Sequence, residues 1–313
     1  MRNQRNQIEM GKYSKYKLAL LGTPIEHSLS PDIHRIFAEG CGLDIEYIKI
    51  DTDKPRLKDT VERLKSEDFS GFNCTMPLKE EIMKYIDWKS GQSEFLGVAN
   101  TVKINKINNA QNKNNKFMLN GYTTDGDGMA AGIRYNGIDV TGKNILVFGA
   151  GGTTKSVVLA LIINKAKNII ILNRSKANLD IIENLFVDYI DLSNIAVDLL
   201  NLENIEKYIK KFDIDILINT SRLGMTGIKD SEESPGFDPE YNFLRLMKQD
   251  SAVVDSVYNP LKTKLLNAAE NNNLTTVDGF WMLVYQGMLA FEIWTGRKVP
   301  EEYIEKAHGI IKR

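Results

Sequence analysis

The sequence predicts an α/β protein of two domains, each built on a layered and mainly parallel sheet. Short β-like runs alternate with helical patterns along most of the chain, which is typical of strand–helix–strand units. The length of 313 residues is about twice that of a ~150-residue domain. The composition, 42% hydrophobic and 26% charged, is near the average of soluble globular domains and excludes a disordered or collagen-like chain.

Charge, cysteine and histidine content narrow the classes of function. The 40 Lys and Arg residues balance the 41 Asp and Glu residues, so the net charge gives no electrostatic basis for binding nucleic acid or an anionic membrane. Two cysteines (Cys41, Cys74) and three histidines (His27, His34, His308) are too few for a disulfide framework or a His-rich metal site. We therefore predict a cytoplasmic protein without a metal that acts on small molecules.

The N-terminal segment, residues 1–15, is polar and lacks the apolar run of a signal peptide, so we expect a flexible tail there. The longest apolar stretches are far shorter than the ~20 residues that a membrane-spanning helix needs. Structure is expected from residue 16 onwards.

Strand and helix patterns alternate through the first part of the chain. Ser30 and Pro31 open a helix, with Ser30 as the expected N-cap and Pro31 in the first turn. The expected elements are strands at 17–22, 46–50 and 71–75, helices at 30–39 and 54–65, a hairpin at 101–120 whose Asn-rich loop lies at the surface, a Gly-rich turn at 121–128 and a helix at 129–135.

A second α/β unit begins at Lys143. Its first strand, residues 144–148, is a continuous apolar run, as expected of a parallel strand that is buried on both faces. The other expected elements are a helix that ends near Asn164, strands at 168–172, 214–218 and 252–256, and C-terminal helices at 279–295 and 301–311.

The clearest chemical signal is the glycine-rich turn after this first strand, which consists of Gly149, Ala150, Gly151, Gly152 and Thr153. Glycines let the backbone approach a pyrophosphate, and the N-terminus of the following helix offers free N–H groups and a partial positive charge. Thr154 replaces the last glycine of the usual fingerprint. A turn that serves packing alone is the alternative; the apolar strand before the turn and the helix after it favour a Rossmann-type nucleotide site.

The end of the next strand indicates which dinucleotide binds. An NAD site usually carries a carboxylate there, whereas a basic group suits the 2′-phosphate of NADP. The strand ends in Asn173, Arg174, Ser175 and Lys176, with no carboxylate before Asp180. These residues favour NADP(H) over NAD as the cofactor. An Arg174 that is only a solvated turn residue is the alternative, and the glycine-rich turn at Gly149–Gly152 argues against it.

Three further clusters lie outside this unit. Ser28 and Ser30 place two hydroxyls beside a helix start, which suits a carboxylate. Lys79 follows a strand end, and Asp125 lies in a Thr-Thr-Asp-Gly sequence. Taken separately, each cluster is also compatible with a cap, a solvated charge or an ordinary turn.

Together these segments resemble the shikimate dehydrogenase family over nearly the whole chain. Ten motifs occur in the family's order, at Gly22–His34, Asn73–Lys79, Gly97–Thr101, Thr124–Gly126, Gly149–Gly152, Asn173–Ser175, Asn219–Met225, Asp255–Pro260, Asp278–Gln286 and Phe291–Gly296. The resemblance implies a substrate domain at 16–127 and 280–313, and a Rossmann-type NADP-binding domain at 128–279. The C-terminal helices would thus return to the substrate domain.

The resemblance also implies a role for each matching residue. Lys79 and Asp125 would form the catalytic pair, and Ser28 and Ser30 would hold the carboxylate of shikimate. The substrate ring and hydroxyls would contact Thr75, Asn100, Tyr258 and Gln286. The cofactor would be bound by Gly149, Ala150, Gly151, Gly152, Thr153, Asn173, Arg174, Ser175, Ser256 and Gly279.

The chain departs from the family pattern at three positions. Thr123 stands where the family commonly has Asn, and Asn178 where a second basic residue is frequent. Arg222 occupies a position where a small residue or proline is usual.

The expected reaction is the reversible reduction of 3-dehydroshikimate to shikimate by NADPH, in the biosynthesis of chorismate and aromatic amino acids. Two alternatives stay open: a quinate/shikimate dehydrogenase with broader substrate and cofactor use, and a non-catalytic sensor of a shikimate-like ligand. The acidic residue that the first often carries in its ribose-binding turn is missing at 173–176, and retention of Lys79 and Asp125 argues against the second. The predicted oligomeric state is a monomer or a homodimer.

Overall fold

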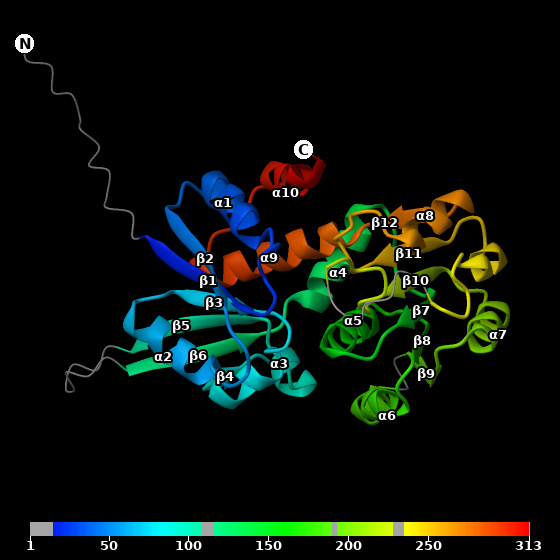
Figure 1. Cartoon of the computed structure of the whole chain (residues 1–313), viewed down its shortest axis with the longest axis horizontal. Helices are drawn as coiled ribbons and strands as arrows, with labels where there is room; N and C mark the ends of the chain where they lie inside the picture. Colours follow the sequence, from blue (N-terminus) through cyan, green and yellow to red (C-terminus); the bar gives the residue numbers. More distant parts are fainter. Residues whose placement is uncertain (1–14, 108–115, 190–192, 228–234, 313) are drawn as a thin grey trace, which may run out of the picture.

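The computed structural model describes residues 15–107, 116–189, 193–227 and 235–312, which form two α/β units side by side (Figure 1). Residues 1–14 of the expected tail (1–15) and residues 108–115 of the expected Asn-rich loop (105–115) lie outside the described residues, whereas residues 105–107 belong to a strand. Within the described part, no helix has both the length and the apolar composition that crossing a bilayer requires.

The first unit contains a six-stranded sheet in the order β2-β1-β3-β5-β6-β4. The strands are β1 (Tyr16–Gly22), β2 (Ile45–Asp51), β3 (Gly71–Cys74), β4 (Trp88–Lys89), β5 (Thr101–Ile107) and β6 (Lys116–Tyr122). β1 pairs in parallel with β2 and β3, as predicted, but the hairpin β5–β6 joins β3 in antiparallel orientation. The sheet is therefore mixed, with β5 antiparallel to both of its neighbours and the other pairs parallel.

Helices cover both faces of this sheet: α1 (Ser30–Cys41), α2 (Leu57–Ser66), η1 (Glu81–Tyr85) and α3 (Gly91–Leu96). α2 packs Leu57, Val61 and Leu64 on one face. It begins three residues later than predicted, because a turn at Lys54 precedes it. Ser30 is not the N-cap of α1: Leu29 takes that position, and Ser30 is the first helical residue.

The second unit has an all-parallel sheet in the order β12-β11-β10-β7-β8-β9, the doubly wound order of a Rossmann domain. Its strands are β7 (Asn144–Phe148), β8 (Asn168–Asn173), β9 (Asn194–Leu199), β10 (Ile216–Asn219), β11 (Ala252–Asp255) and β12 (Thr275–Val277). Ile145 and Val147 face one hydrophobic core, whereas Leu146 and Phe148 face the other. Burial on both faces explains the continuous apolar run of β7.

The helices of this unit lie on both sides of the sheet (Figure 1). They are α5 (Gly152–Ile163), α6 (Lys176–Leu185), η2 (Val187–Tyr189), α7 (Leu202–Phe212), η3 (Asn242–Leu246) and α8 (Lys264–Asn271). The sheet order reverses between β7 and β10, and in such sheets ligands bind beyond the carboxyl ends of the strands at this point.

α4 (Asp125–Tyr135) and α9 (Gly279–Thr295) join the two units and pack against each other (Figure 1). α4 starts at Asp125, so the predicted Gly-rich turn at 121–128 is wrong. The glycines allow close packing instead: a Cβ on Gly126 would lie 2.0 Å from the Ser156 carbonyl oxygen, and one on Gly128 would lie 2.6 Å from the Gln286 nitrogen.

The C-terminal helices return to the first unit, as expected. The Trp294 indole at the end of α9 donates to the Val102 carbonyl at 2.9 Å. α10 (Glu301–His308) packs on α1, and η4 (Gly309–Lys312) follows it.

A buried histidine makes the first unit sensitive to acid. His34 on α1 stacks on Tyr47, with ring centroids 4.5 Å apart, and burial lowers its pKa to about 3. Below pH 6.5 this histidine binds a proton in the unfolded chain but not in the folded chain. The free energy of unfolding therefore decreases as the pH is lowered from 6.5 to about 3. We expect a loss of up to about 1.4 kcal/mol per pH unit from this group.

Urea unfolding of the wild type and of His34→Phe at several pH values tests this expectation. Buried Asp255, whose pKa burial raises to about 6, contributes to stability with the opposite sign in part of the same range. Its contribution cancels in the difference between the two proteins. A difference that stays constant between pH about 7 and about 5 would contradict the assignment to His34.

Candidate active site

A cavity of about 960 Å³ lies between the two units and collects the predicted site residues. Its lining comes from the carboxyl ends of β3, β7, β8, β10 and β11, and from the first turns of α1, α4, α5 and α9. The predicted residues found in that lining are Ser28, Ser30, Thr75, Lys79, Asn100, Asp125, Gly149, Ala150, Gly151, Gly152, Thr153, Asn173, Arg174, Ser175, Ser256, Tyr258, Gly279 and Gln286. Segments from both units therefore build one site.

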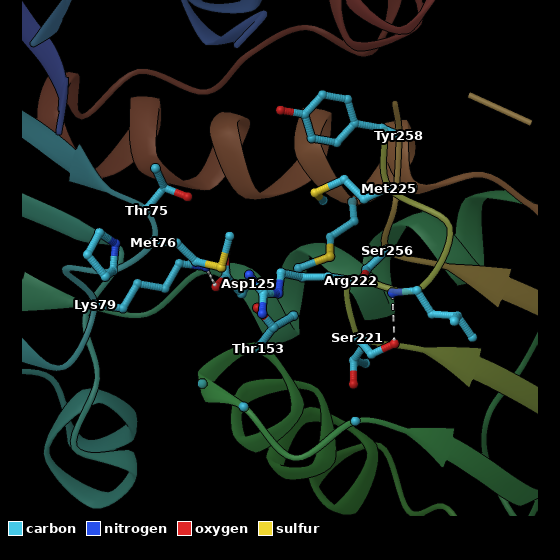
Figure 2. A pocket seen from close by; sticks show the side chains of 18 of the residues that line it. Thr75, Met76, Lys79, Asp125, Thr153, Ser221, Arg222, Met225, Ser256 and Tyr258 are labelled. Carbon is cyan, nitrogen blue, oxygen red and sulfur yellow. Dashed lines mark hydrogen bonds and ion pairs between the residues drawn. The ribbon is translucent and has the colours of Figure 1, made fainter. Parts of the chain in front are cut away.

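Lys79 and Asp125 form an ion pair in this cavity (Figure 2). The Lys79 Nζ lies 2.5 Å from Asp125 Oδ2, and their side chains are 20% and 6% exposed. Lys79 follows the turn at the end of β3, whereas Asp125 is the first residue of α4. Asp125 Oδ1 accepts a second hydrogen bond, from Asn100 Nδ2 at 2.8 Å, so both carboxylate oxygens are held in place.

A network of buried polar side chains contacts the Asp125 side of this pair. Asn100 Nδ2 also lies 2.9 Å from Thr124 Oγ1 and 3.1 Å from Gln286 Oε1, and the Thr124 N–H donates to Asn100 Oδ1 at 2.8 Å. Asn73 Nδ2 donates to the Asn100 carbonyl at 3.0 Å. A buried polar network whose hydrogen bonds are all formed is rigid, so the position of the Asp125 carboxylate is fixed.

Ser28 and Ser30 present adjacent hydroxyls at the start of α1. Ser28 Oγ donates to Ser30 Oγ at 3.1 Å, and the Ser30 N–H lies 3.3 Å from Ser28 Oγ. Because Leu29 is the N-cap, Ser30 Oγ is not used to cap the helix. Two hydroxyls beside a helix N-terminus can donate to an anionic oxygen.

The Tyr47 hydroxyl links this end of the site to the polar network, since it donates to Asn73 Oδ1 at 2.8 Å. Burial raises the pKa of Tyr47. Tyr47 and Asn73 lie on β2 and β3, and sequence reasoning assigned neither of them a role in the site.

The glycine-rich loop leaves open space above the N-terminus of α5. Gly149 has a φ of +118°, and a Cβ there would lie 2.8 Å from Thr220 Oγ1, so a larger residue would disrupt the loop. Thr154, which replaces the usual glycine, accepts from the Gly151 N–H at 3.1 Å and contacts Thr220 Oγ1 at 2.8 Å. The threonine thus closes the turn, and the first turn of α5, which contains no acidic residue, is suited to a phosphate group.

The end of β8 forms a second polar edge of the cavity. Asn173 Nδ2 donates to the Ser175 carbonyl at 3.2 Å, and Ser175 caps α6. Arg174 and Asn178 line the cavity here. Lys176 does not: it pairs with Asp180 at 2.5 Å. Of the basic side chains that the structure describes at this edge, Arg174 is therefore the one that a bound anion would meet.

Buried Asp255 fixes the opposite wall of the cavity. It accepts from Asn219 Nδ2 at 2.9 Å, the Val257 N–H at 2.9 Å and Thr263 Oγ1 at 2.7 Å, which anchors the loop that carries Ser256 and Tyr258. A Cβ on Gly279 would lie 2.5 Å from the Ser256 carbonyl carbon, so glycine is needed where α9 meets this loop. The glycine positions and the helix terminus leave a trough that fits a dinucleotide.

Sequence models of known families match three parts of the chain. They are the shikimate dehydrogenase substrate binding domain at residues 20–102, shikimate / quinate 5-dehydrogenase at 133–231 and the shikimate 5'-dehydrogenase C-terminal domain at 279–307. A shikimate dehydrogenase (NADP(+)) from Alkaliphilus metalliredigens is 36% identical over 289 residues, which cover 92% of this chain and 94% of that protein. The chain belongs to the shikimate dehydrogenase family.

Solved structures agree with this family. Shikimate 5-dehydrogenase from Thermus thermophilus in complex with NADP(H) and shikimate has a TM-score of 0.74 and 28% identity, over 95% of this chain and 99% of that chain. Ligand-free 5-ketofructose reductase from a Gluconobacter species has a TM-score of 0.77 and 25% identity, over 96% and 99%. Proteins named for different substrates thus share the fold of the shikimate dehydrogenases.

One departure from the shikimate dehydrogenase pattern lies outside the cavity lining. Thr123 is buried, and its Oγ1 lies 3.1 Å from Ser156 Oγ on α5. It therefore connects the first unit to α5 of the second unit.

Proposed function

We propose that this protein catalyses the reversible, NADPH-dependent reduction of 3-dehydroshikimate to shikimate. The observation that carries the proposal is the Lys79–Asp125 pair, held at 2.5 Å in one cavity with the hydroxyls of Ser28 and Ser30 and the glycine-rich loop. A cyclic hydroxy acid and a dinucleotide need this combination of a carboxylate site, a proton-handling group and a phosphate trough.

Substrate binding is assigned to the side of the cavity formed by the first unit. The Ser28 and Ser30 hydroxyls donate to the substrate carboxylate, which the N-terminus of α1 also stabilises. The ring and its hydroxyl groups contact Thr75, Asn100, Tyr258 and Gln286, which line the cavity between this end and the catalytic pair.

Lys79 and Asp125 handle the proton of the reaction. NADPH, when bound, would supply the hydride that reduces C3 of the substrate. Negative charge then develops on the C3 oxygen, and the Lys79 ammonium stabilises it by donating a hydrogen bond and transferring a proton. Asp125 orients Lys79 through the 2.5 Å contact and, with Asn100 on its other oxygen, has no freedom to rotate away.

Cofactor binding is assigned to the second unit. The first turn of α5 and the loop of Gly149, Ala150, Gly151, Gly152 and Thr153 hold the pyrophosphate, while Asn173, Arg174 and Ser175 hold the adenosine end with its 2′-phosphate. Gly279 would lie near the nicotinamide, and Ser256, whose backbone adjoins Gly279, would be a further cofactor contact. In this proposal, residues 16–127 and 280–313 form the substrate domain, and residues 128–279 form the NADP-binding domain.

A steady-state assay that follows NADPH absorbance tests the function. We expect NADPH to be consumed with 3-dehydroshikimate and much more slowly with 3-dehydroquinate. Comparable rates with both would identify the broader quinate/shikimate activity. Tight binding of shikimate without any turnover would identify a sensor, and would overturn the proposal.

A further inference from the structure

Arg222 extends into the cavity from the loop after β10, at a position where the family usually has a small residue or proline. Figure 2 shows its side chain reaching from this loop toward Asp125 and Thr153, on the other side of the cavity. Among the residues that the structure describes, no side chain or carbonyl forms a hydrogen bond or ion pair with its guanidinium, and the residue is exposed. A cation without a protein partner that faces a cavity is a candidate ligand for an anion.

The loop that carries Arg222 is firmly anchored. Ser221 Oγ and N–H both donate to Asn219 Oδ1, at 2.6 and 3.1 Å, and the Leu223 N–H donates to Ser221 Oγ at 3.1 Å. Asn219 is fixed in turn by buried Asp255. The guanidinium is thus mounted on a backbone with little freedom, which reduces the entropy lost when it binds a ligand.

This loop also lies directly beside the glycine-rich loop. β10 and β7 are neighbouring strands, and a Cβ on Gly149 would lie 3.2 Å from the Ser221 nitrogen. Thr220 Oγ1 contacts Thr154 Oγ1 at the N-terminus of α5 at 2.8 Å. Arg222 therefore starts next to the pyrophosphate trough and spans it.

The other basic side chains that line or flank the trough have partners or lie elsewhere. Lys79 pairs with Asp125 at 2.5 Å, and Lys155 on α5 pairs with Glu80 at 3.2 Å. Arg174 lies just beyond the end of β8, where the adenosine end binds in the proposed function. A pyrophosphate carries two negative charges. Within the described residues, Arg222 is therefore the cation best placed to offset them in this part of the trough.

We propose that Arg222 binds the pyrophosphate of NADP(H) from the side opposite the N-terminus of α5. The inference rests on the proposed function, since it presupposes a dinucleotide in this trough. The planar guanidinium donates to two phosphate oxygens at once, a geometry that lysine cannot reproduce. Arg222 is thus a cofactor-binding residue that this chain has added to the loop-and-helix site.

Binding measurements without turnover test the proposal. NADPH, NADH, ADP-ribose and adenosine 2′-monophosphate are titrated against wild-type protein and Arg222→Gln, by fluorescence for the reduced cofactors and by calorimetry for the fragments. We expect Kd to rise about ten-fold for NADPH, NADH and ADP-ribose, since each contains the pyrophosphate, and to stay unchanged for adenosine 2′-monophosphate. Affinity for NADPH should also fall less steeply with added salt in the variant.

Two matched variants serve as controls. Arg174→Gln should weaken NADPH but not NADH, which separates the 2′-phosphate from the pyrophosphate. Arg245→Gln removes an exposed arginine on η3, outside the cavity lining, and should change nothing. Thermal unfolding of each variant checks that the fold is intact.

Unchanged affinity of Arg222→Gln for NADPH and ADP-ribose would overturn the proposal. A loss confined to shikimate binding would also overturn it and would assign the guanidinium to the substrate carboxylate instead. Failure of the wild type to bind NADPH at all would refute the proposed function rather than the role of Arg222, so the two failures are distinct.

Discussion

Replacing Lys79 with alanine should lower kcat by about 10³-fold and leave the Kd of shikimate within about three-fold of the wild-type value. The lysine pairs with Asp125. In the proposed mechanism it stabilises the charge on the C3 oxygen, which develops only as the reaction proceeds. Its contribution therefore appears in kcat and little in binding. Steady-state kinetics together with calorimetric titration of shikimate measure both quantities.

Asp125→Asn is the matched variant for this prediction. It keeps the size of the side chain and its contact with Asn100, but removes the charge that orients Lys79 at 2.5 Å. We expect kcat to drop about 10²-fold or more. In the Lys79→Ala/Asp125→Asn double variant, the increase in activation free energy should be smaller than the sum of the two single effects, because the two residues act as a unit. Near-normal turnover of Lys79→Ala would show that another group moves the proton.

Arg174→Gln should lower kcat/KM for NADPH about 30-fold and leave kcat/KM for NADH nearly unchanged. A charge-assisted hydrogen bond to the 2′-phosphate is worth roughly 1.5–3 kcal/mol, and NADH does not have this phosphate. The preference of the enzyme for NADPH should therefore largely disappear. Kinetics with each cofactor at saturating 3-dehydroshikimate measure the ratio.

Lys176→Gln is the control for this second prediction. Lys176 is two residues further along the chain, but it pairs with Asp180 at 2.5 Å and does not line the cavity. Its replacement should leave both cofactors unaffected. If wild-type enzyme prefers NADH, or if Lys176→Gln has the larger effect, the assignment of the 2′-phosphate to Arg174 is wrong.

The sequence predicts best the elements in which most side chains are buried, because the sequences of these elements are mostly apolar. β7 and α9 are largely apolar because most of their side chains are covered, and α9 has the predicted bounds of Gly279–Thr295. β4 escaped prediction because two residues, Trp88 and Lys89, show no period. The start of α4 was wrong for a different reason: glycines that look like a turn in sequence permit contact with Ser156 and Gln286, which only the tertiary structure reveals.

The same distinction applies to the site. Lys79, Asp125 and the glycine-rich loop stand out through residue type and motif, whereas Tyr47, Asn73 and Thr124 are ordinary polar residues until strands distant in sequence bring them together. Arg222 departs from the family pattern in the sequence. Its place in the cavity, beside the glycine-rich loop, comes from the pairing of β10 with β7.

A crystal structure of the protein with NADP⁺ and shikimate tests the central claim, that one cavity brings substrate and cofactor together at the Lys79–Asp125 pair. We predict the shikimate carboxylate within about 3.2 Å of the Ser28 and Ser30 hydroxyls, its 3-hydroxyl at the same distance from Lys79 Nζ, and the pyrophosphate at the first turn of α5. Shikimate bound elsewhere, or with its 3-hydroxyl turned away from Lys79, would contradict this account.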